Sequence, residues 1–353
     1  VAIGTIADVV PLTAENWRLV RAGLDRLNSA ARPGLRALAE ATGLAPGAIT
    51  ERDVSFALAP CLNAAGRMGQ PRLAVELLTT PYSVTATELA AHLVRLNKQR
   101  QIETDVMLME ARAQARSQLA DPHAPLVVTR GNDWNLGLIG LVAGRLADDA
   151  HRPAIAISVA GDECRASARA PEGYDLVAAL AAQPVPLRYF GGHARAAGFT
   201  VATSDLEALL GHLRAHLRPA PAVDGAPDGE APHAGKRPLA IDCALPLSRD
   251  LLDRYHALAA LAPYGVDFPT PVFVARDARV VGCWASGPEG RNLRLRLRHG
   301  GVERTALWSR QGARAVALRA LTMVDVAYSI ELFTRRGGEP EVSLRVLDIT
   351  PRA

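Results

Sequence analysis

Two segments of the chain combine residue types that bind phosphate groups. In NAAGRMG, an amide side chain, two glycines and an arginine follow an apolar run. The glycines permit close backbone approach, and Asn63 and Arg67 can hold a phosphate. In RASARA, the side chains of Arg165, Ser167 and Arg169 share one face if the segment is a strand. The alternatives are a turn with a surface arginine in the first segment and a solvent-facing polar edge in the second.

A glycine-rich segment, GGHARAAGFT, carries the most specific local signal. Gly191 and Gly192 let the backbone reach a ligand, and His193 supplies a hydrogen-bond donor or a general acid or base. The small residues 196–198 that follow allow close packing. We expect a glycine-rich turn that leads into a strand, with a purely structural turn as the alternative.

One carboxylate stands at the end of the first apolar segment. Residues Val1–Ile6 are expected to form a buried strand, which would place Asp8 at its carboxyl end, where ligands of α/β sheets bind. A carboxylate there suits a hard divalent cation. Two-metal phosphoryl chemistry needs several ligands around cations about 3.5–4 Å apart, and residues 1–80 contain no second acidic cluster. A turn or helix-capping aspartate is the alternative.

A strict alternation of arginine and leucine marks the segment RNLRLRLR. On a strand, Leu293, Leu295 and Leu297 would face a core, and the arginines between and after them would face outward: Arg294, Arg296 and Arg298. An outward cationic stripe suits the backbone of a nucleic acid. A solvated amphipathic strand is the alternative.

Helical spacing of apolar residues indicates the elements that position these candidates in the first third of the chain. It predicts helices over 14–28, 33–43 and 73–78, and one long helix over 84–118 that Thr85 or Thr87 caps. At 1.5 Å per residue the long helix spans roughly 50 Å, so it is expected to connect two domains.

Strands and helices alternate over residues 125–200, which favours a small α/β domain. Residues 216–238 are rich in Pro, Ala and Gly without periodicity and are typical of a linker. Five short alternating segments after residue 239 predict a small barrel of the OB type. This barrel segment holds 16 basic and 12 acidic residues, whereas residues 1–238 hold 24 of each, so the excess positive charge lies in the barrel.

Composition limits the class of protein. The chain has 353 residues, of which 49% are hydrophobic, with a net charge of +4 and four dispersed cysteines. These values exclude a disordered chain, a disulfide scaffold and a CxxC metal site. No apolar run reaches the roughly 18 residues of a membrane span, and no leader pattern opens the sequence. We expect a cytoplasmic protein without a membrane partner.

The order of the motifs resembles the RecJ family of single-strand-specific DNA exonucleases, in the DHH phosphoesterase superfamily. GTIADVVPL is followed by FALAPCLNAAGRMG, LNKQRQ on the long helix, WNLGLIGLVAGRLA, RASARA, GGHARAAGFT and APYGVDFPTPVF before the barrel. The resemblance covers nearly the whole chain. It implies a mixed α/β protein with five parts: the carboxyl-terminal part of a DHH catalytic domain (1–82), a connecting helix (83–118), a DHH-associated domain (119–215), a linker (216–238) and an OB domain (239–353).

The resemblance also implies an activity and roles for residues. The family hydrolyses single-stranded DNA from 5′ to 3′ with Mn²⁺ or Mg²⁺, releasing mononucleotides in DNA repair and recombination. By position, Asp8 matches a catalytic metal ligand, and Ser167 with Arg169 matches the residues that hold the 5′ end. Asn63 and Arg67 match a turn near the scissile phosphate, while Gly191, Gly192 and His193 match a loop that faces the catalytic domain.

The implied partner is single-stranded DNA, bound by a monomer, with a single-strand-binding protein and a helicase as further partners. The family's Asp-rich motif and DHH triplet are absent, so the chain is expected to start within the catalytic domain and to lack nuclease activity alone. Asn135 replaces a usual His after Trp134, and Asp267 with Phe268 replaces a usual Gly-Asn. The alternatives are a non-catalytic fragment that binds single-stranded DNA and a DHH phosphodiesterase that acts on short oligonucleotides or cyclic dinucleotides.

Overall fold

The computed structural model describes residues 1–121, 123–218, 238–319, 323–334 and 340–352. The chain divides into two compact units, Val1–Asp25 with Glu230–Ala353, and Arg26–Gly229. The linker expected over 216–238 lies outside the described residues except for its first three positions and its last. Among the described residues, no helix is both long enough and apolar enough to cross a membrane.

Residues 1–82 are helical where they are regular. The elements are α1 (Ala2–Ala7), α2 (Ala14–Ala30), α3 (Pro33–Ala41), α4 (Glu51–Asp53), a π-helical turn (Val54–Leu58), α5 (Ala59–Arg67) and α6 (Pro71–Thr79). The helices expected from apolar spacing are therefore confirmed. The strand expected over Val1–Ile6 is wrong, because this segment forms α1 and Asp8 is its C-cap. Its apolar run is as short as one helical turn and a half, and at that length composition does not separate helix from strand.

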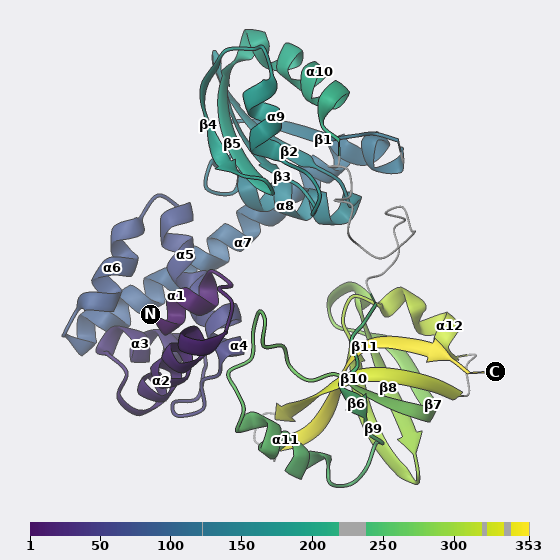
Figure 1. Ribbon diagram of the computed structural model, residues 1–353. Helices are drawn as coiled ribbons and strands as arrows, with labels where there is room; N and C mark the ends of the chain where they lie inside the picture. The colour runs from purple at the N-terminus through teal and green to yellow at the C-terminus, as the bar shows by residue number, and fades with distance from the viewer. Residues whose placement is uncertain (122, 219–237, 320–322, 335–339, 353) are drawn as a thin grey trace. The chain divides into compact units, whose positions relative to one another are not determined.

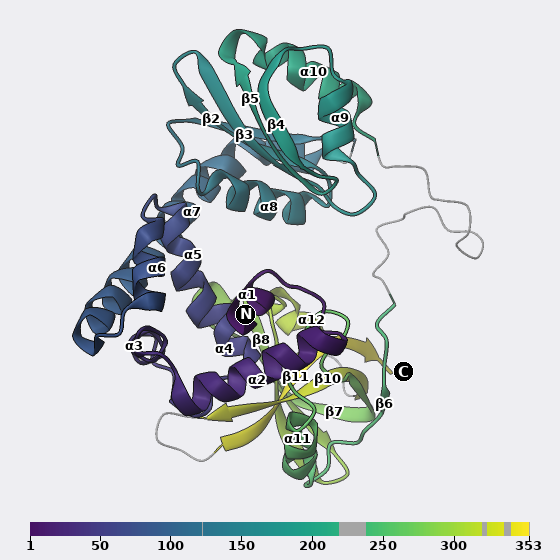
Figure 2. The same ribbon diagram turned by 60° about the vertical axis from the view of Figure 1, so that its left-hand side comes forward.

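Helix α7 (Ser83–Ala120) is the long helix expected from the sequence. Its 38 residues give a length of about 57 Å. The helix packs against α3 and α5 near its start and reaches the α/β domain at its end (Figures 1 and 2). The expected threonine cap is wrong, since Tyr82 is the N-cap and makes no capping hydrogen bond through its side chain.

The α/β domain has a five-stranded sheet of order β1-β2-β3-β5-β4, in which only the β1–β2 pair is parallel. The strands are β1 (Val127–Asn132), β2 (Ala154–Ala160), β3 (Glu163–Arg169), β4 (Leu187–His193) and β5 (Ala196–Ala202). Helix α8 (Ile139–Ala150) packs on one face with α7, and α9 (Leu176–Ala182) with α10 (Leu206–His216) packs on the other (Figure 1).

Two glutamines of α7 close the β1 edge of this sheet. The Gln118 side chain accepts a hydrogen bond from the Val128 backbone N–H and donates one to the Val128 carbonyl, both at 2.9 Å. Gln114 makes the same pair of bonds with the backbone of Arg130, at 3.0 and 2.7 Å. The polar groups of an edge strand are thus satisfied by side chains of a helix.

The second sheet closes into a barrel. Its order is β10-β11-β9-β8-β7-β6, and β10 pairs with β7 to complete the circle. The strands are β6 (Cys243–Ala244), β7 (Phe273–Ser286), β8 (Asn292–His299), β9 (Val302–Trp308), β10 (Met323–Thr334) and β11 (Pro340–Pro351). The five strands expected after residue 239 are β7 to β11. In the described part of this region, helices α11 (Leu251–Ala259) and α12 (Ala315–Arg319) accompany the strands.

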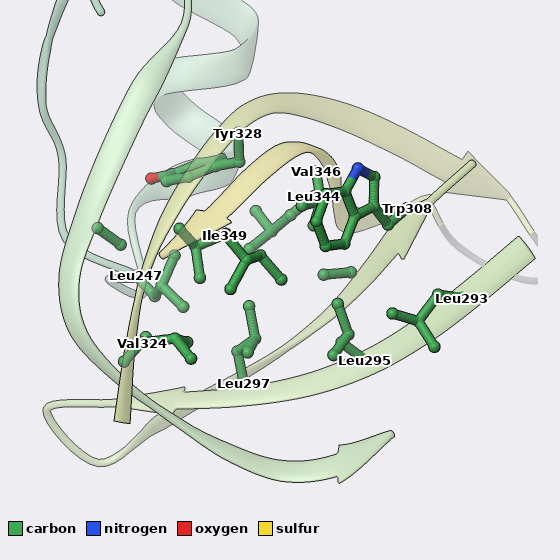
Figure 3. Packing of buried hydrophobic residues seen from close by; sticks show 14 of the residues in the cluster. Leu247, Leu293, Leu295, Leu297, Trp308, Val324, Tyr328, Leu344, Val346 and Ile349 are labelled. Atoms are coloured by element: carbon green, nitrogen blue, oxygen red, sulfur yellow. The ribbon is translucent and has the colours of Figure 1, made fainter. Parts of the chain in front are cut away.

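The barrel core confirms the alternation of RNLRLRLR. Leu293, Leu295 and Leu297 are fully buried and point into the barrel core, which also contains Trp308 and Tyr328 (Figure 3). The arginines of β8 therefore point outward, because side chains alternate between the two faces of a strand.

The first residues of the chain pack on the loop that enters the barrel. Trp17 donates a hydrogen bond from Nε1 to the Pro263 carbonyl at 3.1 Å, and the Leu12 backbone N–H donates to the Val266 carbonyl at 2.8 Å. In this loop Asp267 has φ = 61°. That left-handed conformation favours glycine, which agrees with the glycine that the family resemblance expects at this position.

Candidate functional site

Strand β3 presents a hydroxyl and a guanidinium side by side. Arg169 donates from Nη1 to the Ser167 Oγ at 2.9 Å and to the Ala168 carbonyl at 2.8 Å. Both side chains are half-buried, on the face opposite to the buried residues of the strand. Because the guanidinium has five N–H donors, further donors remain for an anion. None of the ion pairs among the described residues involves Arg169.

Gly140 of α8 leaves the space that Arg169 occupies. A Cβ at Gly140 would lie 2.9 Å from Nη2 of Arg169 and 3.2 Å from Oγ of Ser167. One turn along the helix, a Cβ at Gly144 would meet only the Arg169 Cγ, at an ordinary 4.0 Å. The glycine at position 140 therefore sets how close α8 comes to the Ser167–Arg169 pair.

Arg67 adds positive charge near Arg169, and Arg100 lies near both Arg67 and Arg145. Burial lowers the pKa of Arg169, and the charge of Arg67 lowers it further. Burial also lowers the pKa of Arg100 on α7, as do the charges of Arg67 and Arg145. Arg145 pairs with Asp105 at 2.9 Å. Guanidiniums stay protonated despite such shifts, so their mutual repulsion favours a bound anion.

Arg67 links α5 to the α/β domain. Its Nη1 donates a hydrogen bond to the Gly137 carbonyl at 3.2 Å. Asn63 is exposed one turn earlier on α5, so both side chains lie on one helical face. The turn expected here is wrong, because Asn63 and Arg67 belong to the helix and the chain turns only after Met68. Nearby, Asn135 accepts from the Gly137 N–H at 2.9 Å and donates to Glu103 at 3.3 Å.

Gly191, Gly192 and His193 are also not in a turn, since they end strand β4. Gly192 has φ = 140°, and a Cβ there would lie 2.2 Å from the Ala196 carbonyl oxygen, so only glycine fits. His193 is exposed, and its Nδ1 accepts a hydrogen bond from the Arg195 backbone N–H at 3.3 Å.

The sheet register brings the two sequence motifs together. Ala196 of β5 lies opposite Arg169 on one side and His193 on the other. Gly198 lies in the same way between Ser167 and Gly191. Strands lie about 4.8 Å apart, so Arg169 and His193 face each other across about 10 Å. The small residues of β5 form the floor between them.

Arg165 shares the face of Ser167 but is otherwise engaged. Its Nε donates to Glu163 at 2.8 Å, and Arg188 binds the other oxygen of the same carboxylate at 2.7 Å. These two hydrogen bonds lower the pKa of Glu163. Arg165 is therefore a weaker candidate for phosphate binding than Arg169.

Asp8 belongs to the other compact unit and is exposed. Among the described residues there is no group of three or more His, Cys, Asp or Glu side chains arranged to hold a metal ion. The residues around Asp8 therefore do not fit a two-metal centre, which needs several ligands.

The barrel carries a second cationic surface, on the outward face of strands β7, β8, β9 and β11. One row across these strands contains Trp284, Arg294, Leu307 and Arg345, and the next contains Gly282, Arg296, Thr305 and Ser343. Arg298 lies in a third row, where it pairs with Glu303 at 2.9 Å from Nε. Arg294 has a buried Nε without a hydrogen-bond partner.

Several of these residues were not singled out as site residues by the sequence: Arg100, Gly140, Arg145 and Arg345. Arg100 lies in LNKQRQ on α7, and it comes near Arg67 only because α5 packs against α7. Gly140 lies in a glycine-interrupted helix, where regular spacing of glycines is the available signal. Arg345 of the barrel needs the strand register, which a single sequence does not give.

Two family models match the chain. Residues 123–218 match the DHHA1 domain, and residues 241–348 match the RecJ OB domain.

Curated relatives extend this similarity. The chain is 41% identical over 214 residues to the single-stranded-DNA-specific exonuclease RecJ of Bacillus subtilis. The matched region covers 60% of this chain and 27% of that protein. It is 35% identical over 302 residues to the Thermus thermophilus exonuclease of the same name. This matched region covers 84% of this chain and 41% of that protein. The chain thus spans less than half the length of these two relatives.

A solved structure agrees over the whole chain. RecJ of Thermus thermophilus in complex with Mg²⁺ matches with a TM-score of 0.76 at 30% identity, covering 100% of this chain and 52% of that one. Its complex with Mn²⁺ matches equally well, with a TM-score of 0.76 at 31% identity and coverage of 100% and 49%.

Proposed function

We propose that this chain, which belongs to the RecJ family, is the part of a single-stranded-DNA exonuclease that holds the 5′-terminal phosphate and the strand behind it. The observation that carries the proposal is the half-buried Arg169, which shares a hydrogen bond with Ser167 and has no carboxylate partner among the described residues. A buried cation without an anion is costly, and a terminal phosphate supplies the missing charge.

Selectivity for an end follows from the same geometry. A terminal phosphate carries up to two charges and three free oxygens, whereas an internal phosphodiester carries one charge. Arg169 and Ser167 offer adjacent donors on one side, with the charge of Arg67 near them, and the small residues of β5 lead to His193 on the other side. A pocket that grips the end fixes the direction of degradation, which supports 5′-to-3′ hydrolysis that releases mononucleotides.

Hydrolysis needs more than the described residues supply. Among the described residues, Asp8 is the one carboxylate that matches a metal ligand of the family, and the relatives of known structure hold Mg²⁺ or Mn²⁺. We infer that the remaining metal ligands belong to the segment that the longer relatives contain and that this chain does not cover.

The division of labour follows the domain boundaries expected from the sequence: 1–82, 83–118, 119–215, 216–238 and 239–353. In this proposal the barrel binds the strand through Arg294 and Arg296 without reading its sequence, while Arg298, the third arginine of the expected stripe, is paired with Glu303. The intact protein would act as a monomer in the cytoplasm, in DNA repair and recombination, with a single-strand-binding protein and a helicase as partners.

The experiment compares the affinity of the purified chain for one oligothymidylate with a 5′-phosphate or a 5′-hydroxyl, labelled at its 3′ end, in EDTA. Arg169→Gln is expected to reduce affinity for the 5′-phosphate by roughly 10- to 150-fold more than for the 5′-hydroxyl, because a charge-assisted contact is lost. Arg165→Gln is the control, since Arg165 is exposed and already paired, and its effect should stay below about threefold.

A second pair of variants tests the geometry without removing charge. Gly140→Ala pushes against Nη2 of Arg169 and should lose part of the preference for the 5′-phosphate, whereas Gly144→Ala should keep it. If Arg169→Gln weakens both oligonucleotides equally, Arg169 does not recognise the 5′ end and the proposal is wrong.

A further inference from the structure

Trp284 is the exposed tryptophan of the barrel. Its side chain is 38% exposed, whereas Trp134 and Trp308 are buried at 7% and 6%. It stands on β7 directly opposite Arg294 of β8, and both point outward because their neighbours Cys283 and Leu295 are buried and paired with each other. The barrel thus presents an aromatic ring and a guanidinium side by side on its outward face.

Gly282 makes room for the ring. A Cβ at Gly282 would lie 3.2 Å from Cζ3 of Trp284 and 3.6 Å from Cβ and Nε of Arg296. The indole therefore reaches along β7 over position 282 and approaches the side chain of Arg296. A side chain at position 282 would require the ring to shift by a few tenths of an ångström.

Charge surrounds the ring on the side of β8. Arg294 and Arg296 make no ion pair among the described residues, and the Nε of Arg294 is buried without a partner. Arg345 extends the row of Trp284 and Arg294 beyond the apolar Leu307. An aromatic face beside two unpaired guanidiniums can bind both parts of one nucleotide, because the ring stacks with the base and a guanidinium binds the phosphate.

We propose that Trp284 is a base-stacking site, on which one base of a single strand rests while Arg294 and Arg296 hold the adjacent phosphates. The site takes any base, since each base has a π-face. This inference rests on the proposed binding of single-stranded DNA by the barrel and assigns the position where a base is held.

The experiment uses the whole chain and two ligands of equal length and charge: an oligothymidylate with a 5′-hydroxyl, and the same backbone with abasic sites throughout. Trp284→Ala is expected to weaken binding of the oligothymidylate by about 5- to 150-fold, the range for one lost stacking contact. Binding of the abasic strand should change little, and the salt dependence should be unaltered because no phosphate contact is lost.

Two matched variants accompany it. Trp284→Phe keeps an aromatic ring and should retain most of the affinity. Leu252→Ala removes an apolar side chain of the same exposure, 38%, from α11, and should bind like the unaltered chain. Quenching of the Trp284 fluorescence by the oligothymidylate should be lost in Trp284→Phe although this variant still binds, and thermal melting checks that each variant is folded.

The outcomes separate the two proposals. If the unaltered chain binds neither strand, both the binding role of the barrel and the stacking site are wrong. If it binds the oligothymidylate and Trp284→Ala binds equally well, the stacking site alone is wrong. An equal loss on both strands also overturns it, because Trp284 would then act only by positioning Arg294.

Discussion

Replacing Arg294 and Arg296 together with glutamine is expected to flatten the salt dependence of single-strand binding, whereas replacing Arg298 is not. The three arginines look equivalent in the sequence, but their surroundings differ. Arg298 is held by Glu303 through Nε at 2.9 Å and a second, shorter contact, while Arg294 and Arg296 make no ion pair among the described residues. A guanidinium that is already paired with a carboxylate contributes little to the release of counterions when DNA binds.

The magnitude follows from counting phosphates. Each one neutralised on a single strand contributes about 0.7 to the slope of log affinity against log salt. The double variant should therefore reduce the slope by about 1.4, and Arg298→Gln should change it by much less than 0.7. Glu303→Gln is the opposite test, since it frees Arg298 and should steepen the slope by up to about 0.7.

The assay measures binding of the whole chain to an oligothymidylate with a 5′-hydroxyl, so that the 5′-phosphate site contributes little. Affinities are taken over a series of salt concentrations in EDTA. The buried Leu293, Leu295 and Leu297 are untouched, so thermal melting should show the barrel folded in every variant.

An unchanged slope in the double variant would show that the outward face of β8 is solvated and that DNA takes another path. Equal effects of Arg296→Gln and Arg298→Gln would show that the ion pair with Glu303 does not decide which arginine binds, and the reasoning from surroundings would be wrong.

Two predictions concern the other parts of the chain. The purified chain should release no mononucleotides from single-stranded DNA in Mn²⁺ or Mg²⁺, because its described residues hold no metal-ligand cluster. Release of mononucleotides would refute this prediction. In a longer protein that carries the family's upstream motifs, Asp8→Ala should abolish the nuclease activity. Hydrogen bonds from Arg165 and Arg188 lower the pKa of Glu163 from 4.5 in the folded state, so its stabilisation is present above that value and is lost as pH falls through the folded pKa. Glu163→Gln should therefore melt slightly below the unaltered chain at pH 7, and the difference should shrink in acid; a difference independent of pH would contradict it.

Local patterns predicted what depends on neighbours in the sequence. The alternation in RNLRLRLR placed three leucines in a core and three arginines outside it, and the same rule put Ser167 and Arg169 on one face. The periodicity of α7 was strong enough to give its bounds within about two residues.

Short apolar segments were ambiguous because a local pattern of a few residues fits both a helix and a strand. Val1–Ile6 is compatible with a strand, but no other strand of the described residues pairs with it, and it forms a helical turn and a half in which only Ala2 is buried. GGH looked like a turn, yet it ends strand β4, and Gly192 allows the close approach of β4 to β5.

The candidate site depends on contacts between distant residues. Arg67 and Arg169 are about one hundred positions apart, and their electrostatic coupling arises only when α5 meets the α/β domain. The pairing of Trp284 with Arg294 is a matter of register, which a shift of one residue would abolish. Neither relation leaves a pattern in a single sequence.

The bonds from Gln114 and Gln118 to the backbone of β1 also restrict movement. Four residues of helix advance about 6.0 Å and two residues of strand about 6.6 Å, so both amides meet the strand in step. Sliding or rolling α7 would break four hydrogen bonds together, so the end of the helix moves with the sheet as one rigid body. Because β1 is closed in this way, β4 is the edge of the sheet left for pairing with another extended chain.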